Sequence, residues 1–280
     1  MTSNLQRNRM ITTTVIHVIL IIFSIIMIVP FIWMALTAFK SVTESTSVNP
    51  FVILPTVWRT DAFVSVWNNM NFGLLYINTL LLIFWRVVAA VLTATLAGYA
   101  FARLEFRGRD FMFSLILFQM MIPSQIFIIP QYSMVSALGM TNSIFALVFP
   151  GLVTAFGTFL LKQAYMSLPV SLEEAARLDG CNIFQTFLLI MAPLARSSMV
   201  ALGIFTAVFA YKDMMWPLIV NTSSTKMPLA AALATMQGQY SSNYPQLMAA
   251  SLIACLPMIV IYLIFQRQFI EGIATSGGKL

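Results

Sequence analysis

Long uninterrupted runs of apolar residues dominate the pattern of hydrophobic and polar positions along this chain. A helix needs roughly 20 consecutive apolar residues to cross the hydrocarbon core of a bilayer. Six segments meet that length, and shorter polar stretches separate them. The pattern predicts six membrane-spanning helices, at residues 14–38, 77–101, 111–131, 143–161, 198–220 and 247–265.

Proline lies inside or near the ends of several of these segments. In a membrane, neighbouring helices can satisfy the carbonyl groups that proline frees, so proline does not argue against the spans. The residues concerned are Pro30, Pro123, Pro130, Pro150 and Pro257.

Composition supports an integral membrane protein of the all-α class. Hydrophobic residues make up 60% of the 280 positions, the mean hydropathy is +0.89, and 9% of residues are charged. A soluble domain carries about 25% charged residues. The first apolar run is about twice the length of a signal-peptide core, so we expect an uncleaved anchor after Arg7 and Arg9.

Lysine and arginine predict the orientation, because they collect on the cytoplasmic side. An N-terminus in the cytoplasm places most basic residues inside, few outside and Arg86 within a span. The inner ones are Arg7, Arg9, Arg103, Arg107, Arg109, Lys162, Arg177, Arg196, Arg267 and Lys279. The outer ones are Lys40, Arg59, Lys212 and Lys226. Both termini are therefore expected in the cytoplasm, and the net charge of +6 reflects topology rather than a nucleic-acid partner.

One inner loop carries a short polar helix in this otherwise apolar chain. Ser171 followed by Glu174 is typical of a capping box, and Gly180 suits the position just after a helix. The pattern predicts a helix of about two turns at residues 172–179.

Two turns are not stable alone in water, so this helix must lie on a surface. That surface is either another protein or the chain's own bundle. A second cap-like pair, Asn182 and Gln185, predicts another short helix, and Pro193 marks the start of the next span.

The same loop carries a recognisable motif. Glu174-Ala175-Ala176, then Gly180, then residues 190–193 (Ile-Met-Ala-Pro) resembles the signature of binding-protein-dependent ABC importer permeases. Ala192 departs from the usual leucine. AGYAFARLEFRGRD (97–110), MMIPSQIFIIPQY (120–132), WPLIV (216–220) and QRQFIEGIATSGGKL (266–280) resemble the second, shorter permease of the maltose-type carbohydrate importers.

The resemblance implies the type I ABC importer permease fold, with six transmembrane helices and a cytoplasmic coupling helix. It divides the chain into an N-terminal tail and first span (1–40), an extracytoplasmic loop (41–76), a permease core (77–266, with the coupling loop at 163–193) and a cytoplasmic tail (267–280). The expected location is the bacterial cytoplasmic membrane.

The resemblance also implies partners. The coupling helix of this family sits in a cleft of a separate ATPase subunit, and the residues that this assigns are Glu174, Ala175, Ala176, Asp179, Gly180 and Pro193. A homologous permease (as a heterodimer), two ATPase copies and an extracytoplasmic solute-binding protein complete the expected carbohydrate importer. The chain has no G-x-x-x-x-G-K-[ST] phosphate loop, so ATP and magnesium are expected on the partners, with no cofactor, metal or catalytic residue here.

Four residues are candidates for the translocation path: Arg86, Gln119, Lys212 and Asp213. A cation near mid-membrane is costly unless it faces a partner or a wet cavity. Arg86 therefore either lines the path or pairs structurally with a carbonyl or carboxylate. Lys212 departs from the family pattern; it either joins Arg86 in a path for an acidic or phosphorylated sugar, or snorkels outward.

The third outer loop, residues 221–246, resembles the family segment that reaches into the binding protein. Its candidate contacts are Lys226, Met227, Gln237 and Tyr240, and its MPLAAALATM core predicts a short helix.

Two other classes compete. A secondary transporter calls for an internal repeat or paired intramembrane carboxylates, and a membrane enzyme calls for a polar catalytic cluster. The sequence shows none of these, and His17 is its single histidine.

Overall fold

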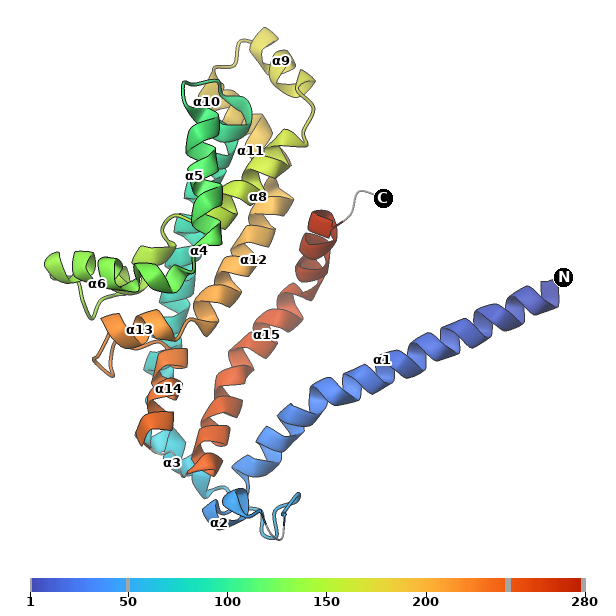
Figure 1. Ribbon diagram of the computed structural model, residues 1–280, viewed down its shortest axis with the longest axis vertical. Coiled ribbons are helices and arrows are strands. Elements are labelled where there is room, and N and C mark those ends of the chain that lie inside the picture. Colours follow the sequence, from blue (N-terminus) through green and yellow to red (C-terminus); the bar gives the residue numbers. More distant parts are fainter. Residues whose placement is uncertain (1, 49–50, 240–242, 278–280) are drawn as a thin grey trace. The chain divides into compact units, whose positions relative to one another are not determined.

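The computed structural model describes residues 2–48, 51–239 and 243–277, in which every regular element is a helix (Figure 1). The first half of the chain forms α1 (Thr2–Ala38), α2 (Val42–Thr46), α3 (Asp61–Asn69), α4 (Phe72–Arg103), α5 (Arg109–Met121), η1 (Ser124–Phe127), α6 (Ile128–Ala137), α7 (Ile144–Val148) and η2 (Phe149–Gly151). The second half forms α8 (Ala155–Met166), α9 (Ser171–Leu178), α10 (Ile183–Thr186), η3 (Phe187–Met191), α11 (Ala192–Leu194), α12 (Arg196–Lys212), α13 (Met215–Val220), α14 (Leu229–Gln239) and α15 (Tyr244–Gly277).

The chain divides into two compact units. The first joins α1, α2 and α3 to the N-terminal part of α15, where Ala38, Ala62 and Ala249 pack together. Gln246 Nε2 donates to Ser65 Oγ at 2.8 Å in the same unit. The second unit comprises residues 72–234 and the part of α15 after Pro257, and it includes both α9 and Arg86.

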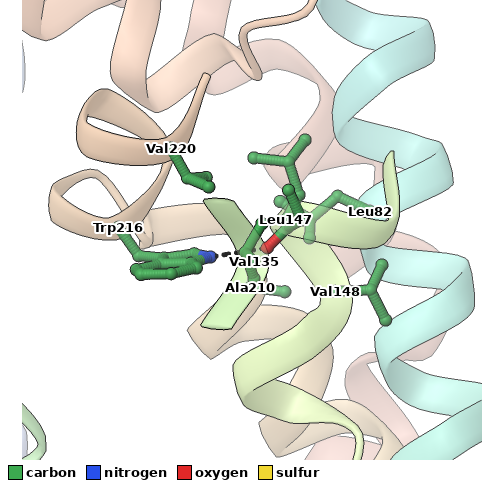
Figure 2. Close-up of a cluster of buried hydrophobic side chains, with 8 residues drawn as sticks. Leu82, Val135, Leu147, Val148, Ala210, Trp216 and Val220 are labelled. Carbon is green, nitrogen blue, oxygen red and sulfur yellow. Dashed lines mark hydrogen bonds between the residues drawn. The ribbon is translucent and has the colours of Figure 1, made fainter. Parts of the chain in front are cut away.

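The second unit is built around α4, which packs along α8 and α12. One buried cluster joins Tyr99 of α4, Tyr165 of α8 and Phe187 of η3. Another, shown in Figure 2, gathers Leu82, Val135, Leu147, Val148, Ala210, Trp216 and Val220 from five helices. The Trp216 indole donates to the carbonyl oxygen of Ala146 at 2.8 Å, so its polar edge is satisfied within the core.

Three predicted spans are single helices. The apolar stretches Met10–Ala38, Phe72–Arg103 and Tyr244–Gln266 are each long enough to cross a membrane. They contain the predicted spans 14–38, 77–101 and 247–265. Pro30 and Pro257 lie inside these continuous helices, as the sequence allowed.

The third predicted span, 111–131, is wrong as a continuous helix. Helix α5 ends at Met121, and the chain turns by 101° before α6 (Figure 1). Ile122, directly before Pro123, is extended at φ −89° and ψ 128°. Proline disfavours the helical conformation in the residue that precedes it, which explains the break.

The fourth and fifth predicted spans are also broken. Residues 143–161 divide into α7 with η2 and then α8, bent by 49° where Thr154 is extended and caps α8. Residues 198–220 divide where α12 stops before Asp213, and α13 begins afterwards with Pro217 in its first turn, where no amide is needed. The third bent pair is instead Ile183–Leu194 with Arg196–Lys212, at 71°, so this crossing begins and ends earlier in the chain than predicted. With each bent pair counted as one crossing, the described residues hold up to six spans.

Candidate coupling surface and membrane pocket

The polar helix of the long loop is present as α9, at one end of the bundle of α4, α8 and α12 (Figure 1). It covers Ser171–Leu178, within one residue of the predicted range. The predicted capping box is wrong: Val170 is already helical, and no side chain caps the first turn. The helix begins one residue early because Pro169 and Val170 carbonyls accept from the amides of Leu172, Glu173 and Glu174.

Gly180 ends α9 as the sequence predicted. Its φ is +84°, in the left-handed region that favours glycine. The Gly180 amide donates to the Arg177 carbonyl and the Cys181 amide to the Ala176 carbonyl, which is the Schellman pattern. A Cβ added at Gly180 would meet no atom within 4 Å, so the space beside it is open.

Glu173, rather than Glu174, fastens α9 to the bundle. Its carboxylate lies 3.5 Å from Arg103 Nε at the end of α4, and each side chain is only 8% exposed. Arg103 Nη2 also donates to the carbonyl oxygens of Tyr165 and Leu168, at 2.6 and 2.5 Å. One guanidinium therefore joins α4, α8 and α9.

The opposite face of α9 is open. Glu174, Ala175 and Asp179 are exposed, whereas Ala176 is buried against the bundle. Leu178 is 89% exposed, although an apolar leucine side chain is more often buried than left in contact with water. This face presents two carboxylates beside a protruding apolar side chain.

The segment after α9 bends where the sequence places Pro193. Asn182 and Gln185 form the predicted reciprocal cap of α10. The chain then passes through the π-helical turn η3 and bends by 71° before α12. Proline cannot donate to the carbonyl four residues earlier, so a wide turn and a bend follow from Pro193.

Arg86 is paired, which was one of the two interpretations of this residue. Its Nη1 lies 2.8 Å from Asp213 Oδ2, between the middle of α4 and the end of α12. Arg86 is 8% exposed. Gly151 allows the guanidinium stem to pass, because a Cβ there would lie 2.9 Å from Arg86 Cδ. The pair offsets the cost of a cation at this depth.

A pocket of 230 Å³ opens beside this ion pair. Its walls come from α4, η1, α6, η2 and α13, together with Asp213 directly after α12. Its lining residues are Arg86, Ser124, Gln125, Ile128, Gln131, Pro150, Gly151, Asp213, Met215 and Trp216.

The other path candidates lie apart from that lining. Lys212 is exposed, and its ammonium sits 4.6 Å from the centre of the Phe209 ring. Gln119 has an exposed side chain near the end of α5. The glutamines that line the pocket with Arg86 are Gln125 and Gln131, not Gln119. A role for Lys212 or Gln119 in the path stays a prediction.

The predicted contact loop is anchored by two buried asparagines. Asn78 Nδ2 donates to the carbonyls of Thr225 and Met227, each at 3.0 Å, and Asn221 Nδ2 donates to the Lys226 carbonyl at 2.9 Å. The Lys226 side chain is exposed. The short helix expected here is α14, on which Gln237 is exposed; Tyr240 lies outside the described residues.

Several important residues were not found by sequence reasoning. Arg103 was used only to predict the topology. Glu174, rather than its neighbour Glu173, was chosen as a site residue, and Asn78 was assigned no role. A polar residue inside an apolar run was the available signal for Asn78. The pairing of Arg103 with Glu173 joins residues 70 positions apart, and no local pattern reveals it.

Comparison with known families finds a match over most of the chain. Residues 90–273 match the family described as the binding-protein-dependent transport system inner membrane component. This range includes α9, Asp213 and the loop before α14. Arg86 and the first three helices lie ahead of it.

Two curated proteins are similar in sequence. The arabinooligosaccharides transport system permease protein AraQ of Halalkalibacterium halodurans is 35% identical over 193 residues, which is 69% of each chain. The diacetylchitobiose uptake system permease protein NgcG of Streptomyces coelicolor is 30% identical over 265 residues, covering 93% of this chain and 87% of NgcG.

One solved structure has the same fold. It is a bacterial ABC transporter involved in the import of the acidic polysaccharide alginate. One of its chains superposes with a TM-score of 0.76 at 23% identity, covering 92% of this chain and 96% of that one.

Proposed function

Because the chain belongs to the family of binding-protein-dependent transport system inner membrane components, it is a multi-pass permease of an ABC importer, and we propose that its cargo is a sugar or oligosaccharide. The similarity to AraQ and NgcG, both named for oligosaccharide uptake, supports that cargo. Transport, not catalysis, is the role of the family, and this excludes the secondary-transporter and enzyme alternatives.

The open face of α9 carries the proposal for energy coupling. A protruding Leu178 beside Glu174 and Asp179 matches a cleft with an apolar pocket and basic rim. Family membership implies an ATPase partner, and α9 is the coupling helix that docks there. Glu173 and Arg103 then pass the movement of α9 to α4. ATP and magnesium bind to that partner.

The remaining partners follow from the family. A homologous second permease completes the path as a heterodimer, and two ATPase copies serve the two coupling helices. The solute-binding protein meets the opposite end, at the loop that carries Lys226 and Met227. The excess of basic residues expected on the α9 side supports a cytoplasmic location for that end and for both termini.

The ion pair disfavours an acidic cargo for this subunit. Arg86 and Asp213 lie 2.8 Å apart, so their formal charges cancel within the pocket. An acidic or phosphorylated sugar would meet no net positive charge from these two groups. The cationic path, which called for Arg86 together with Lys212, is therefore less favoured, because Arg86 is paired with Asp213.

The test uses the complete transporter, reconstituted with its ATPase, second permease and candidate binding proteins. Arabinobiose, cellobiose, maltose and diacetylchitobiose are assayed for stimulated ATP hydrolysis and uptake. We expect stimulation by at least one of them. Leu178→Arg should abolish co-purification of the ATPase, while Met166→Arg, at another exposed apolar site, should not. Stimulation by none of the sugars contradicts the cargo, and an unaffected Leu178→Arg contradicts the docking.

A further inference from the structure

The pocket beside the ion pair has the make-up of a carbohydrate site. Its polar side chains come from separate elements and converge on one space: Arg86, Ser124, Gln125, Gln131 and Asp213. Trp216, which is 4% exposed, adds part of a rigid wall. We propose that this chain itself holds a subsite for one uncharged sugar ring in this pocket, an inference that rests on the proposed function.

Arg86 is prepared to bind a hydroxyl group. Its Nη1 is engaged with Asp213 at 2.8 Å, while its Nε is buried and has no hydrogen-bond partner among the described residues. A buried donor without a partner is costly, so a ligand oxygen that reached it would be stabilised. The carboxylate of Asp213 can accept further hydrogen bonds, and each glutamine amide both donates and accepts. Vicinal hydroxyls of a sugar match this mixture.

The backbone around the pocket favours a wet cavity. The chain is interrupted between α5 and α6, and η1 supplies Ser124 and Gln125 to the pocket wall. Non-helical backbone at membrane depth is tolerated only where protein buries it or water reaches it. Arg86 lies near the middle of α4, a spanning helix, so the pocket lies well within the membrane. A hydrated pocket at that depth is where a polar cargo must pass.

Trp216 gives the pocket a rigid wall. Its side chain is only 4% exposed, its indole Nε1 donates to the Ala146 carbonyl, and its ring packs in the buried cluster of Figure 2. A wall that is already ordered lowers the entropic cost of binding, and the hydrogen-bonding side chains supply the contacts with the sugar.

Charge and size select the ligand. Arg86 and Asp213 cancel, so the pocket offers directional hydrogen bonds without net charge and favours a neutral sugar over a uronic acid. Its 230 Å³ lies below the range of about 300–1,000 Å³ typical of drug-sized ligands. One sugar ring is therefore accommodated at a time, with the rest of an oligosaccharide outside.

The first experiment removes the two amides in the complete transporter. Gln125→Ala with Gln131→Ala should lower uptake of the transported neutral disaccharide about tenfold, because the ligand loses hydrogen bonds. ATP hydrolysis stimulated by the loaded binding protein should persist, since α9 is unchanged. Ser133→Ala is the matched control: it lies on α6 outside the lining, and its hydroxyl donates to its own helix at the Ile129 carbonyl.

The second experiment changes the charge and compares neutral arabinobiose, cellobiose and maltose with digalacturonate. Asp213→Asn leaves Arg86 uncompensated and should raise uptake of digalacturonate relative to the neutral sugars. The double variant Arg86→Gln with Asp213→Asn removes both charges and should retain the preference for neutral sugars. It also controls for a folding defect caused by the uncompensated charge in the single variant.

The outcomes separate the two proposals. If the wild-type transporter takes up none of the probes, the proposed carbohydrate cargo is wrong, and so is the subsite. If it takes up a neutral sugar and the glutamine double variant matches Ser133→Ala, the function stands and the subsite is wrong. Equal uptake of digalacturonate and neutral sugars by the wild type also overturns the subsite, because a neutral pocket then shows no selectivity.

Discussion

Arg103, at the last position of α4, contacts Glu173 in the first turn of α9 at 3.5 Å. The same guanidinium binds the carbonyls of Tyr165 and Leu168. Through this residue the loop helix is attached to a spanning helix at its first turn, while its other end, at Leu178, projects freely. In the proposed coupling mechanism, this contact transmits movement of α9 to α4.

Removal of this contact should loosen α9. In Glu173→Ala, Arg103 keeps its two carbonyl acceptors, but its buried charge loses the compensating carboxylate, which costs about 3 kcal/mol. We expect amide hydrogen exchange in α9 to accelerate and transport to uncouple from ATP hydrolysis. Glu174→Ala, one residue away and exposed, should leave the exchange unchanged while it weakens binding of the ATPase. Equal protection of α9 in Glu173→Ala and the wild type would contradict this assignment.

Gly180→Val should cause strain of roughly 1–2 kcal/mol at a left-handed position. No atom of this chain lies within 4 Å of the added Cβ, so any steric loss beyond the strain arises from the docked ATPase. Gly139→Val is the matched control, because Gly139 has φ +66° and equally open surroundings. Co-purification of the ATPase should fall for Gly180→Val and persist for Gly139→Val. The opposite result removes Gly180 from the docking surface.

The pair of Arg86 and Asp213 should show strong coupling in a double-mutant cycle. Arg86→Met alone leaves a largely buried carboxylate, and we expect a loss of about 3 kcal/mol in stability. Arg86→Met with Asp213→Asn should lose clearly less than the sum of the two single changes. Thermal unfolding of the solubilised permease measures this. Additive losses would mean that the two charges do not interact.

Acid should spare the short helix α2. Hydrogen bonds from Thr56 and from the Ser41 amide and hydroxyl lower the pKa of Glu44 to about 2, below the ordinary value of 4.5. Ionised Glu44 stabilises the folded state, and this contribution is complete at pH values above the pKa of the unfolded chain. The contribution is lost as the pH falls toward the lower pKa of the folded state. The fluorescence of Trp33 and Trp58 should therefore stay unchanged at about pH 4 and change as the pH approaches 2. Glu44→Gln should show the altered signal already at neutral pH.

The orientation is tested by cysteine labelling after Cys181 and Cys255 are replaced. Cysteine at Ser223 should react with an impermeant thiol reagent from outside the cell. Cysteine at Ser171 should react only from inside, because it lies on the basic side of the chain. Reversed labelling would refute the topology and place α9 beyond reach of a cytoplasmic ATPase.

Local patterns in the sequence predicted the structure correctly where the hydrogen bonds of a segment form within that segment. An apolar run satisfies its backbone within its own helix, so α1, α4 and α15 follow from hydropathy alone. Gly180 and the cap of Asn182 with Gln185 were predicted because caps involve residues three or four positions apart. Composition and the basic-residue bias belong to the same kind of information.

Breaks within spans were harder to predict. Pro123 and Pro150 were visible, but the sequence does not say whether neighbours repair a proline or whether the chain turns there. Pro30 and Pro257 leave their helices continuous, whereas Ile122 becomes extended before Pro123. The difference depends on which helices surround each site, and that is a property of the folded unit.

By itself, then, the sequence determined the membrane class, three continuous spans, the short helix α9 and the family motif, because each depends on residues close together in the chain. Only the tertiary structure decided which charges meet: Arg86 with Asp213, and Arg103 with Glu173. It also brought Gln125, Gln131 and Trp216 to one pocket. Such contacts join distant positions, and packing selects among many possible partners only once the helices have broken, turned and come together.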